Sequence, residues 1–437
     1  MLAQFRPAGK EMLPNLRKLT YNARQLPLPE ALSSFLVFLS SSVVELELRQ
    51  LTPGSMPSLL AYLVGRAPHV LDLKLAGSRS SEVDSNALAT CLLRLEKLQF
   101  INTSIRLTPA LWDAIAQHKG LTYASFASPT WGLPPTATGF QPREFARLER
   151  LVIRENFDFL CSLFESQNDL PKIIWVVFQG GCRGAGRNGF RRLCELLPQK
   201  FPNLEVVWLG CHSNAAQEDK ALELGDFSPL MQRKNLRYFH LEHPCGVAVT
   251  ESEFAQLLDA WPGITTLALQ YASSNTDSRG IVYPINWTQP ILPLSVLDIV
   301  AEKIPKVKEL SLILDATAAL GGAWKSDQHQ FECLEKLTVS LSSISQPTPV
   351  ASYLVQRSKK RFSLEYDPPL SLPGITLASL EEEKNKWDQV AQNLGLLYDQ
   401  KERLEKEFRM QMQEERARHM RELKDVMDSS LALSRAE

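Results

Sequence analysis

A glycine-rich stretch is the part of the sequence that comes nearest to a motif with chemistry of its own. It consists of Gly184-Ala185-Gly186-Arg187-Asn188-Gly189 and lies between an expected strand at 173–178 and an expected helix. Glycine-rich turns in that position hold the pyrophosphate of dinucleotides. The next expected strand, however, ends in Gly210-Cys211-His212, without the acidic residue that would bind a ribose hydroxyl. We therefore expect no nucleotide and no other cofactor.

Four arginines beside this stretch leave a simpler alternative open. A helix N-terminus with guanidinium groups nearby can hold a phosphate or an acidic side chain. The four residues are Arg183, Arg187, Arg191 and Arg192. Against this, a glycine-rich turn that only connects a strand to a helix within a repeat needs no ligand.

Cysteine and histidine side chains at the ends of three expected strands supply ligand types for a metal ion. They are Cys182, Cys211, His212, His243 and Cys245, and no two of them have the spacing of a metal motif. The seven cysteines of the chain are scattered and include no C-x-x-C, so we expect reduced thiols. The sequence also lacks G-x-S-x-G, H-E-x-x-H and a P-loop. We therefore expect no metal site and a protein that is not an enzyme.

The elements that position these residues belong to a repeat that covers most of the chain. Each unit has apolar residues at offsets 0, +3 and +5, as in Leu204, Val207 and Leu209, which predicts a short strand with one buried side. Most units begin 25 to 32 residues apart, and one step of 43 residues contains an insertion at 272–293. The units start at Leu16, Val43, Val70, Leu95, Leu121, Leu148, Ile173, Leu204, Leu236, Ile264, Val307 and Leu334, with a degenerate thirteenth copy at Leu364.

The pattern L-x-x-L-x-L at this spacing resembles the leucine-rich repeat, and residues 10–366 carry the resemblance. It implies an α/β solenoid in which parallel strands line a concave face and helices cover the outside. Helical patterns are expected at 57–66, 108–117, 189–197, 251–260 and 294–303. The family's asparagine at offset +8 is mostly missing, with Asn156 as an exception. We therefore expect an irregular array of about 12 to 13 repeats.

A different kind of segment follows the array. We expect a proline-rich linker at 367–375, a charged helix at 376–428 and a disordered tail at 429–437. Apolar residues recur along the helix with heptad spacing, which favours a coiled coil formed with a second copy or a partner, a lone solvated helix being the alternative. The seam consists of Trp387, Val390, Leu394, Leu397, Leu404 and Phe408. Residues 1–12 offer no polar cap, so the hypothesis of a truncated N-terminus stays open.

The concave surface is where we expect a binding site. If the apolar triplet points inward, offsets +2, +4 and +6 face the concavity, and in the middle copies these positions gather aromatic residues and arginine. Such a composition is typical of an interface hot spot. The alternative is that inserted loops cover these side chains or that they pack on one another. The predicted contact residues are Tyr123, Arg150, Arg154, Trp175, Val177, Val206, Trp208, Tyr238 and His240.

The sequence thus predicts a non-enzymatic protein that recognises a protein partner. Its drifting repeat length and the proline two residues before many triplets most resemble F-box proteins with degenerate leucine-rich repeats, which are abundant in fungi. That resemblance implies the substrate-recognition subunit of a cullin-type (SCF) ubiquitin ligase, although no F-box is recognisable. A leucine-rich-repeat regulator that activates GTPases is an alternative from another class, but no arginine is marked out for that role.

Charge and hydropathy limit which other kinds of partner we expect and in which cellular compartment we expect the protein. The formal net charge is −1, which gives no indication of a nucleic-acid partner. No apolar run approaches the ~18 residues of a membrane helix, so we expect no membrane partner. Without a signal peptide at the N-terminus, we expect an intracellular protein, cytoplasmic or nuclear.

Overall fold

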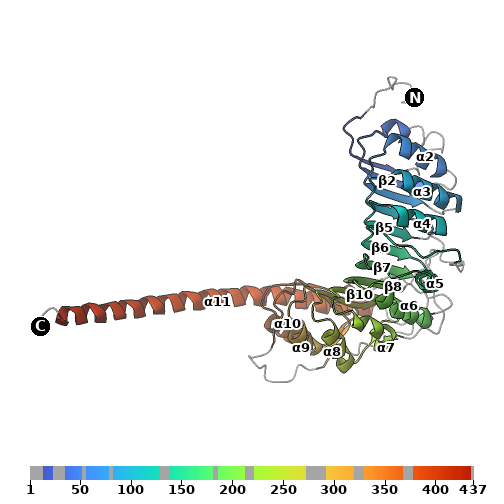
Figure 1. The fold of residues 1–437 in the computed structure, drawn as a ribbon. Helices are drawn as coiled ribbons and strands as arrows, with labels where there is room; N and C mark the ends of the chain where they lie inside the picture. Colours follow the sequence, from blue (N-terminus) through green and yellow to red (C-terminus); the bar gives the residue numbers. More distant parts are fainter. Residues whose placement is uncertain are drawn as a thin grey trace.

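A long parallel sheet is the central structural element of the protein (Figure 1). The structure, a computed structural model, describes residues 13–22, 35–51, 56–77, 82–127, 138–180, 186–211, 221–271, 292–318, 329–367 and 377–434. Within these ranges the sheet has thirteen strands in chain order, and every neighbouring pair for which a register is given is parallel. The strands are β1 (Lys18–Asn22), β2 (Glu45–Leu51), β3 (Asp72–Gly77), β4 (Phe100–Thr103), β5 (Tyr123–Ala127), β6 (Arg150–Arg154), β7 (Trp175–Gly180), β8 (Val206–Cys211), β10 (Tyr238–His243), β12 (Thr266–Tyr271), β14 (Glu309–Leu312), β16 (Lys336–Val339) and β18 (Ser363–Glu365).

Within the described residues, helices connect most of the successive strands and lie along one side of the sheet, as is usual for parallel strands. Side-chain caps fix where several of them begin. Thr108 and Asn156 accept hydrogen bonds from backbone N–H groups of the first turn, and Thr250 forms a capping box with Glu253. The helices are α2 (Met56–Arg66), α3 (Glu82–Arg94), α4 (Pro109–Gln117), α5 (Phe157–Glu165), α6 (Gly186–Lys200), α7 (Leu224–Phe227), α8 (Glu251–Ala260), α9 (Val296–Lys303), α10 (Pro347–Arg357) and α11 (Leu377–Ser434).

Short elements complete the connections between the repeats. Strands β9 (Leu222–Glu223) and β11 (Val247–Ala248) pair with each other, and a 3₁₀ helix spans Ser228–Gln232. A second small parallel sheet joins β13 (Leu292–Pro293), β15 (Leu314–Ala316) and β17 (Ser343–Ile344). No helix of the described part is both long enough and apolar enough to cross a membrane.

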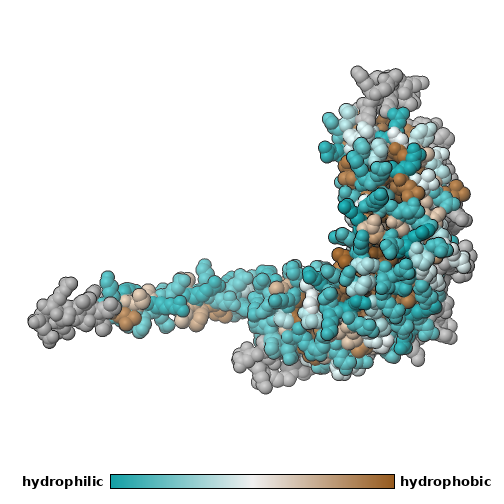
Figure 2. All heavy atoms as spheres, in the orientation of Figure 1, coloured by the Kyte–Doolittle hydropathy of each residue, from teal (hydrophilic) through white to brown (hydrophobic). Residues whose placement is uncertain are grey.

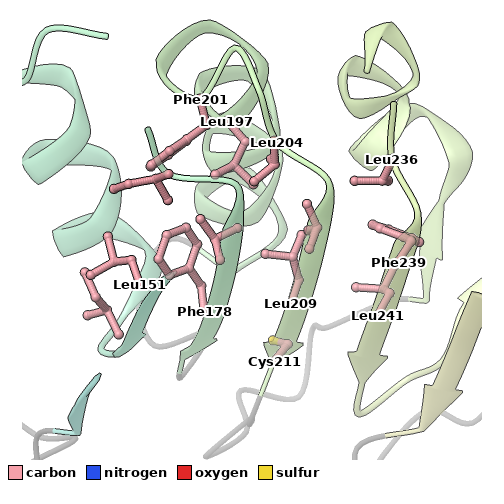
Figure 3. Close-up of a cluster of buried hydrophobic side chains, with 14 of the residues drawn as sticks. Leu151, Phe178, Leu197, Phe201, Leu204, Leu209, Cys211, Leu236, Phe239 and Leu241 are labelled. Carbon is pink, nitrogen blue, oxygen red and sulfur yellow. The ribbon is translucent and has the colours of Figure 1, made fainter. Parts of the chain in front are cut away.

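The core lies between the sheet and its helices and continues from repeat to repeat. Figure 3 shows this for the middle repeats, where Leu151, Phe178, Leu209 and Leu241 project from neighbouring strands into one buried layer. Alternate residues of the strands are buried and half-buried, as the repeat predicts. The predicted combination of a large parallel sheet with helices and a long C-terminal helix is therefore confirmed, in a solenoid-like α/β fold.

The register predicted for the fourth repeat is wrong by three residues. Leu98, Ile101 and Thr103 occupy its buried positions, in place of Leu95, Leu98 and Phe100. Only the first triplet is apolar at all three offsets, because the observed one has Thr103 at +5, while Leu95 and Ile101 are both buried. The buried position accepts Thr103 because its hydroxyl accepts a backbone hydrogen bond at 3.0 Å. Phe100 consequently faces the concave side of the sheet.

Helix α11 covers the end of the array before it projects away from it (Figure 1). Its first half packs along α10, with Trp387 (1% exposed), Val390 and Leu394 buried in the same core as the repeats. The indole Nε1 of Trp387 donates a hydrogen bond of 2.7 Å to the backbone oxygen of Ser342. A solenoid leaves an apolar face at each end, and α11 closes this one.

The seam predicted for α11 is therefore divided between two environments. Four of its members pack within the chain and are not available to a second helix: Trp387, Val390, Leu394 and, in part, Leu397. The seam prediction is wrong for these residues, because they pack against the apolar end of the array in the same chain. Leu404 (58% exposed) and Phe408 (62% exposed) lie beyond the array, where a coiled coil stays a prediction.

The boundaries of the C-terminal segment also differ from the prediction. Helix α11 continues to Ser434, so a disordered tail from residue 429 is wrong up to that point. The residues concerned include leucine and alanine, which favour helix once a helix is under way. The linker predicted at 367–375 lies, apart from Asp367, outside the described residues. So does the insertion predicted at 272–293, apart from Leu292 and Pro293, which form β13.

Among the cysteines that the structure describes, the prediction of reduced thiols holds with one exception. Cys211, at the end of β8, is disulfide-bonded, so the prediction is wrong for this residue. Neighbouring strands lie about 4.8 Å apart, which brings the strand ends of successive repeats close together although they are distant in sequence. The reduced cysteines are Cys91, Cys161, Cys194, Cys245 and Cys333. Burial raises the pKa of the Cys91 thiol to about 12, as expected for an unreactive core residue.

Candidate functional site: the centre of the concave face

Aromatic rings from neighbouring strands stack into a row on the concave face. Phe100 of β4 and Tyr123 of β5 are parallel, with ring centroids 3.9 Å apart, and Tyr123 lies 5.9 Å from Trp175 of β7. The guanidinium of Arg150, on the intervening strand β6, lies 5.2 Å from the centroid of Trp175. In-register parallel pairing produces this row, because it places equivalent positions of adjacent repeats side by side. We call Phe100, Tyr123, Arg150 and Trp175 the aromatic row.

A second group continues this surface over β8 and β10. The rings of Trp208 and His240 are stacked with centroids 4.7 Å apart, and the hydroxyl of Tyr238 lies 3.3 Å from Nδ1 of His240. His240 Nε2 lies 2.9 Å from a carboxylate oxygen of Glu242. Burial, followed by the nearby carboxylates Glu309 and Glu242, raises the pKa of Tyr238. We call Trp208, Tyr238, His240 and Glu242 the Trp208 cluster.

One polar atom of the Trp208 cluster has neither a hydrogen-bond partner nor an ion-pair contact in the described part of the chain. Nε1 of Trp208 is buried and finds no hydrogen-bond acceptor in the part of the chain that the structure describes. A buried donor without a partner costs about 1–3 kcal/mol, so such a group calls for an explanation. A small movement of the exposed rings would offer this donor to an acceptor on a bound molecule.

Charges on the concave face are paired at the N-terminal end and unpaired in the centre. In the first three repeats Lys18 pairs with Glu45, Arg49 with Glu47 and Lys74 with Asp72, all on the strands β1 to β3. By contrast, Arg150 and Arg154 of β6 are exposed and have no carboxylate within 4.0 Å among the described residues. Within the described ranges, the centre therefore presents two guanidinium groups without a carboxylate partner next to aromatic rings.

The structure brings most of the predicted contact residues together. Tyr123, Trp175, Val206, Trp208, Tyr238 and His240 are half-buried and Arg150 and Arg154 exposed, on five successive strands of the sheet. Val177 is the exception: it is only 4% exposed, because its short side chain lies between Val152 and Trp208 and below the level of the larger rings. It therefore supports the surface rather than contacting a partner.

Phe100 and Glu242 belong to this surface but were missed at the sequence level. Phe100 was assigned to the core because of the register error in the fourth repeat. Glu242 occupies offset +6 of its repeat, next to His240 at +4, so the alternation of strand residues could have found it. Glu242 is 15% exposed and His240 14%, which places their contact at the base of the cluster.

The arginines near the glycine-rich stretch are already engaged within the chain. Arg187 pairs with Asp226 and Glu223 at 2.7 Å each, Arg191 with Glu195 at 3.5 Å, and Arg192 with Glu165. Arg183 lies outside the described residues. The acidic side chain that this helix N-terminus was predicted to hold thus comes, at Arg187, from the neighbouring repeat.

The described residues form no metal site, and the comparisons with known proteins suggest no reaction or ligand for this chain. Among the described residues no group of three histidine, cysteine or acidic side chains is placed to hold a metal ion. No protein-family model matches the chain, and no curated protein matches its sequence. The functional argument consequently depends on the geometry of the concave face, whose rings and guanidinium groups are suited to binding.

Proposed function

We propose that the chain is a leucine-rich-repeat protein that recognises a protein partner through the centre of its concave face. The repeat assignment is supported by the agreement between the apolar triplets and the buried strand positions of the array. The recognition function is supported above all by one observation. The aromatic row, which includes Arg150, adjoins the Trp208 cluster on strands β4 to β10, and neither Arg150 nor Arg154 has a carboxylate partner among the described residues.

The chemistry of this surface indicates what the partner presents. Tryptophan, tyrosine and arginine are the residues that contribute most to binding when they lie near the middle of an interface. The half-buried rings offer apolar area at a small loss of side-chain entropy, and the two free guanidinium groups select carboxylates. The expected partner therefore places apolar side chains over Trp175 and Trp208 and acidic groups over Arg150 and Arg154.

Figure 2 is consistent with a localised contact of this kind. The face of the molecule seen there is mostly hydrophilic, with separate hydrophobic patches on the array and along α11. Small, separate apolar patches of this kind are suited to recognition by a few anchoring side chains.

The proposal is tested by identifying the partner from within the site and then measuring its affinity. A photo-crosslinking amino acid at position 150 should capture the partner in native cells, and the same group at Tyr62 on α2 should not. The double variant Trp175→Ala/Trp208→Ala should then weaken binding of the purified partner by at least about thirtyfold, which corresponds to about 2 kcal/mol.

A matched control removes exposed apolar side chains from the outer side of the array. Tyr62 (53% exposed) on α2 and Leu93 (48% exposed) on α3 serve this purpose. The variant Tyr62→Ala/Leu93→Ala should bind as the wild type does. Unchanged affinity of the Trp175→Ala/Trp208→Ala variant, with an unchanged thermal transition, would refute recognition through this face.

A further inference from the structure

A basic groove lies where α11 leaves the array. One wall is formed by residues 359–361, between α10 and β18, and the other by residues 398–413 of α11. The groove has a volume of about 930 Å³. From residue 398 to residue 413 the helix rises by roughly 22 Å at ~1.5 Å per residue, enough for an extended peptide of about seven residues.

The charge of the groove differs from that of the chain as a whole. Seven of its thirteen lining residues are lysine or arginine and three are acidic, giving a formal charge of 7 − 3 = +4, against −1 for the full chain. Positive charge is therefore concentrated at this junction, although the chain as a whole is nearly neutral.

Three of these cations are uncommitted. Lys360, Arg403 and Lys406 are exposed and have no carboxylate within 4.0 Å in the described ranges. Other cations of the groove are held in place by the fold: Arg361 lies 3.4 Å from Asp399, and Lys401 donates to the backbone oxygen of Ser358. These contacts connect the two walls, and Lys360, Arg403 and Lys406 line the same groove.

We propose that this groove binds an acidic peptide segment of a partner protein. Three carboxylates lie among its seven cations. This mixture suits a peptide in which acidic residues alternate with neutral ones better than it suits the continuous phosphate backbone of a nucleic acid. Met410, which is exposed on the same wall, offers an apolar contact for one of the neutral residues. The site is separate from the concave face and does not depend on the function proposed for it.

A second copy of the projecting helix does not match this groove. Residues 402–424 contain six acidic and seven basic side chains, a balance of 6 to 7, so the helix presents no acidic surplus to the groove of another molecule. Electrostatic complementarity, which steers association and selects partners, therefore points to a different chain.

The test uses the full chain and a fluorescein-labelled ten-residue peptide of alternating glutamate and serine, followed by fluorescence anisotropy at low salt. The wild type should bind this peptide saturably, more weakly as salt is added, and should not bind the same peptide with lysine in place of glutamate. The variant Lys360→Glu/Lys406→Glu should weaken binding at least tenfold.

The control variant Arg418→Glu/Arg421→Glu makes the same change of charge on the same exposed helix, outside the groove. It should bind the acidic peptide within about twofold of the wild type, and all three proteins should share one thermal transition. Three outcomes overturn the proposal: no saturable binding by the wild type, an equal loss in both variants, or tighter binding of a ten-nucleotide single-stranded DNA than of the peptide.

Discussion

Replacing Trp387 by alanine should release α11 from the end of the array. The indole is 1% exposed, packs in the continuous core, and donates its Nε1 hydrogen to Ser342 at 2.7 Å. Removing a buried tryptophan costs about 3–5 kcal/mol, and the carbonyl left without a donor contributes to this loss. Trp387 is the largest of the four α11 side chains buried in that core, the others being Val390, Leu394 and Tyr398, so the loss should appear first as local undocking.

Hydrogen exchange of the peptides that cover residues 380–400 measures this directly, because exchange reports the free energy of local opening. In Trp387→Ala these peptides should exchange much faster, while strands β4 to β8 keep their protection. Trp387→Phe retains most of the packing and should lose only about 1–3 kcal/mol. Leu404→Ala, on the exposed part of the same helix, should change nothing beyond about 0.5 kcal/mol. Equal protection in Trp387→Ala and in the wild type would refute a capping role for α11.

Two buried polar groups give further predictions. Burial lowers the pKa of His243 to about 4, so the unfolded chain takes up a proton between pH 6.5 and 4 that the folded chain does not. The free energy of unfolding should therefore decrease as the pH is lowered through that window. Between pH 7 and pH 5, urea unfolding should show a decrease about 2 kcal/mol larger for the wild type than for His243→Asn. An equal decrease in the two proteins would contradict this prediction. Arg187→Ala leaves the Asp226 carboxylate (2% exposed) without its cation and should cost about 2 kcal/mol, allowing for the partial exposure of Arg187. The loss should be smaller in the Asp226→Asn background, and additive losses in a double-mutant cycle would show that the two residues are not coupled.

The repeat made the fold of the array predictable because each strand carries its own signal. The triplet Leu204, Val207 and Leu209 recurs with small variations, and the helix before β8 must cross back over the sheet to keep the strands parallel. The same local signal fails where apolar residues are too frequent. In the fourth repeat the fully apolar triplet Leu95, Leu98 and Phe100 favours the wrong register, and only the pairing with the neighbouring strands shows that Thr103 occupies the last buried position.

The role of α11 could not be read from its own pattern. A heptad of apolar residues describes one buried helix face and does not say what buries it. Here the end of the array takes the first half of that face at Trp387, Val390 and Leu394, and leaves Leu404 and Phe408 exposed. The basic groove was hidden for a related reason: Lys360 and Lys406 are far apart in sequence, and only the docking of the helix brings them to one space.

The packing within the aromatic row affects how the concave face would bind. Arg150 already lies against Trp175, so part of the rotamer freedom that an arginine loses on binding has been lost in folding. Ordering such a side chain at an interface otherwise costs about 0.5–1.5 kcal/mol. Loss of Trp175 would therefore remove an apolar contact and also free Arg150 to sample other rotamers. The strands that carry the row belong to a continuous sheet with a buried core beneath it, so the rings are held in place before any partner arrives.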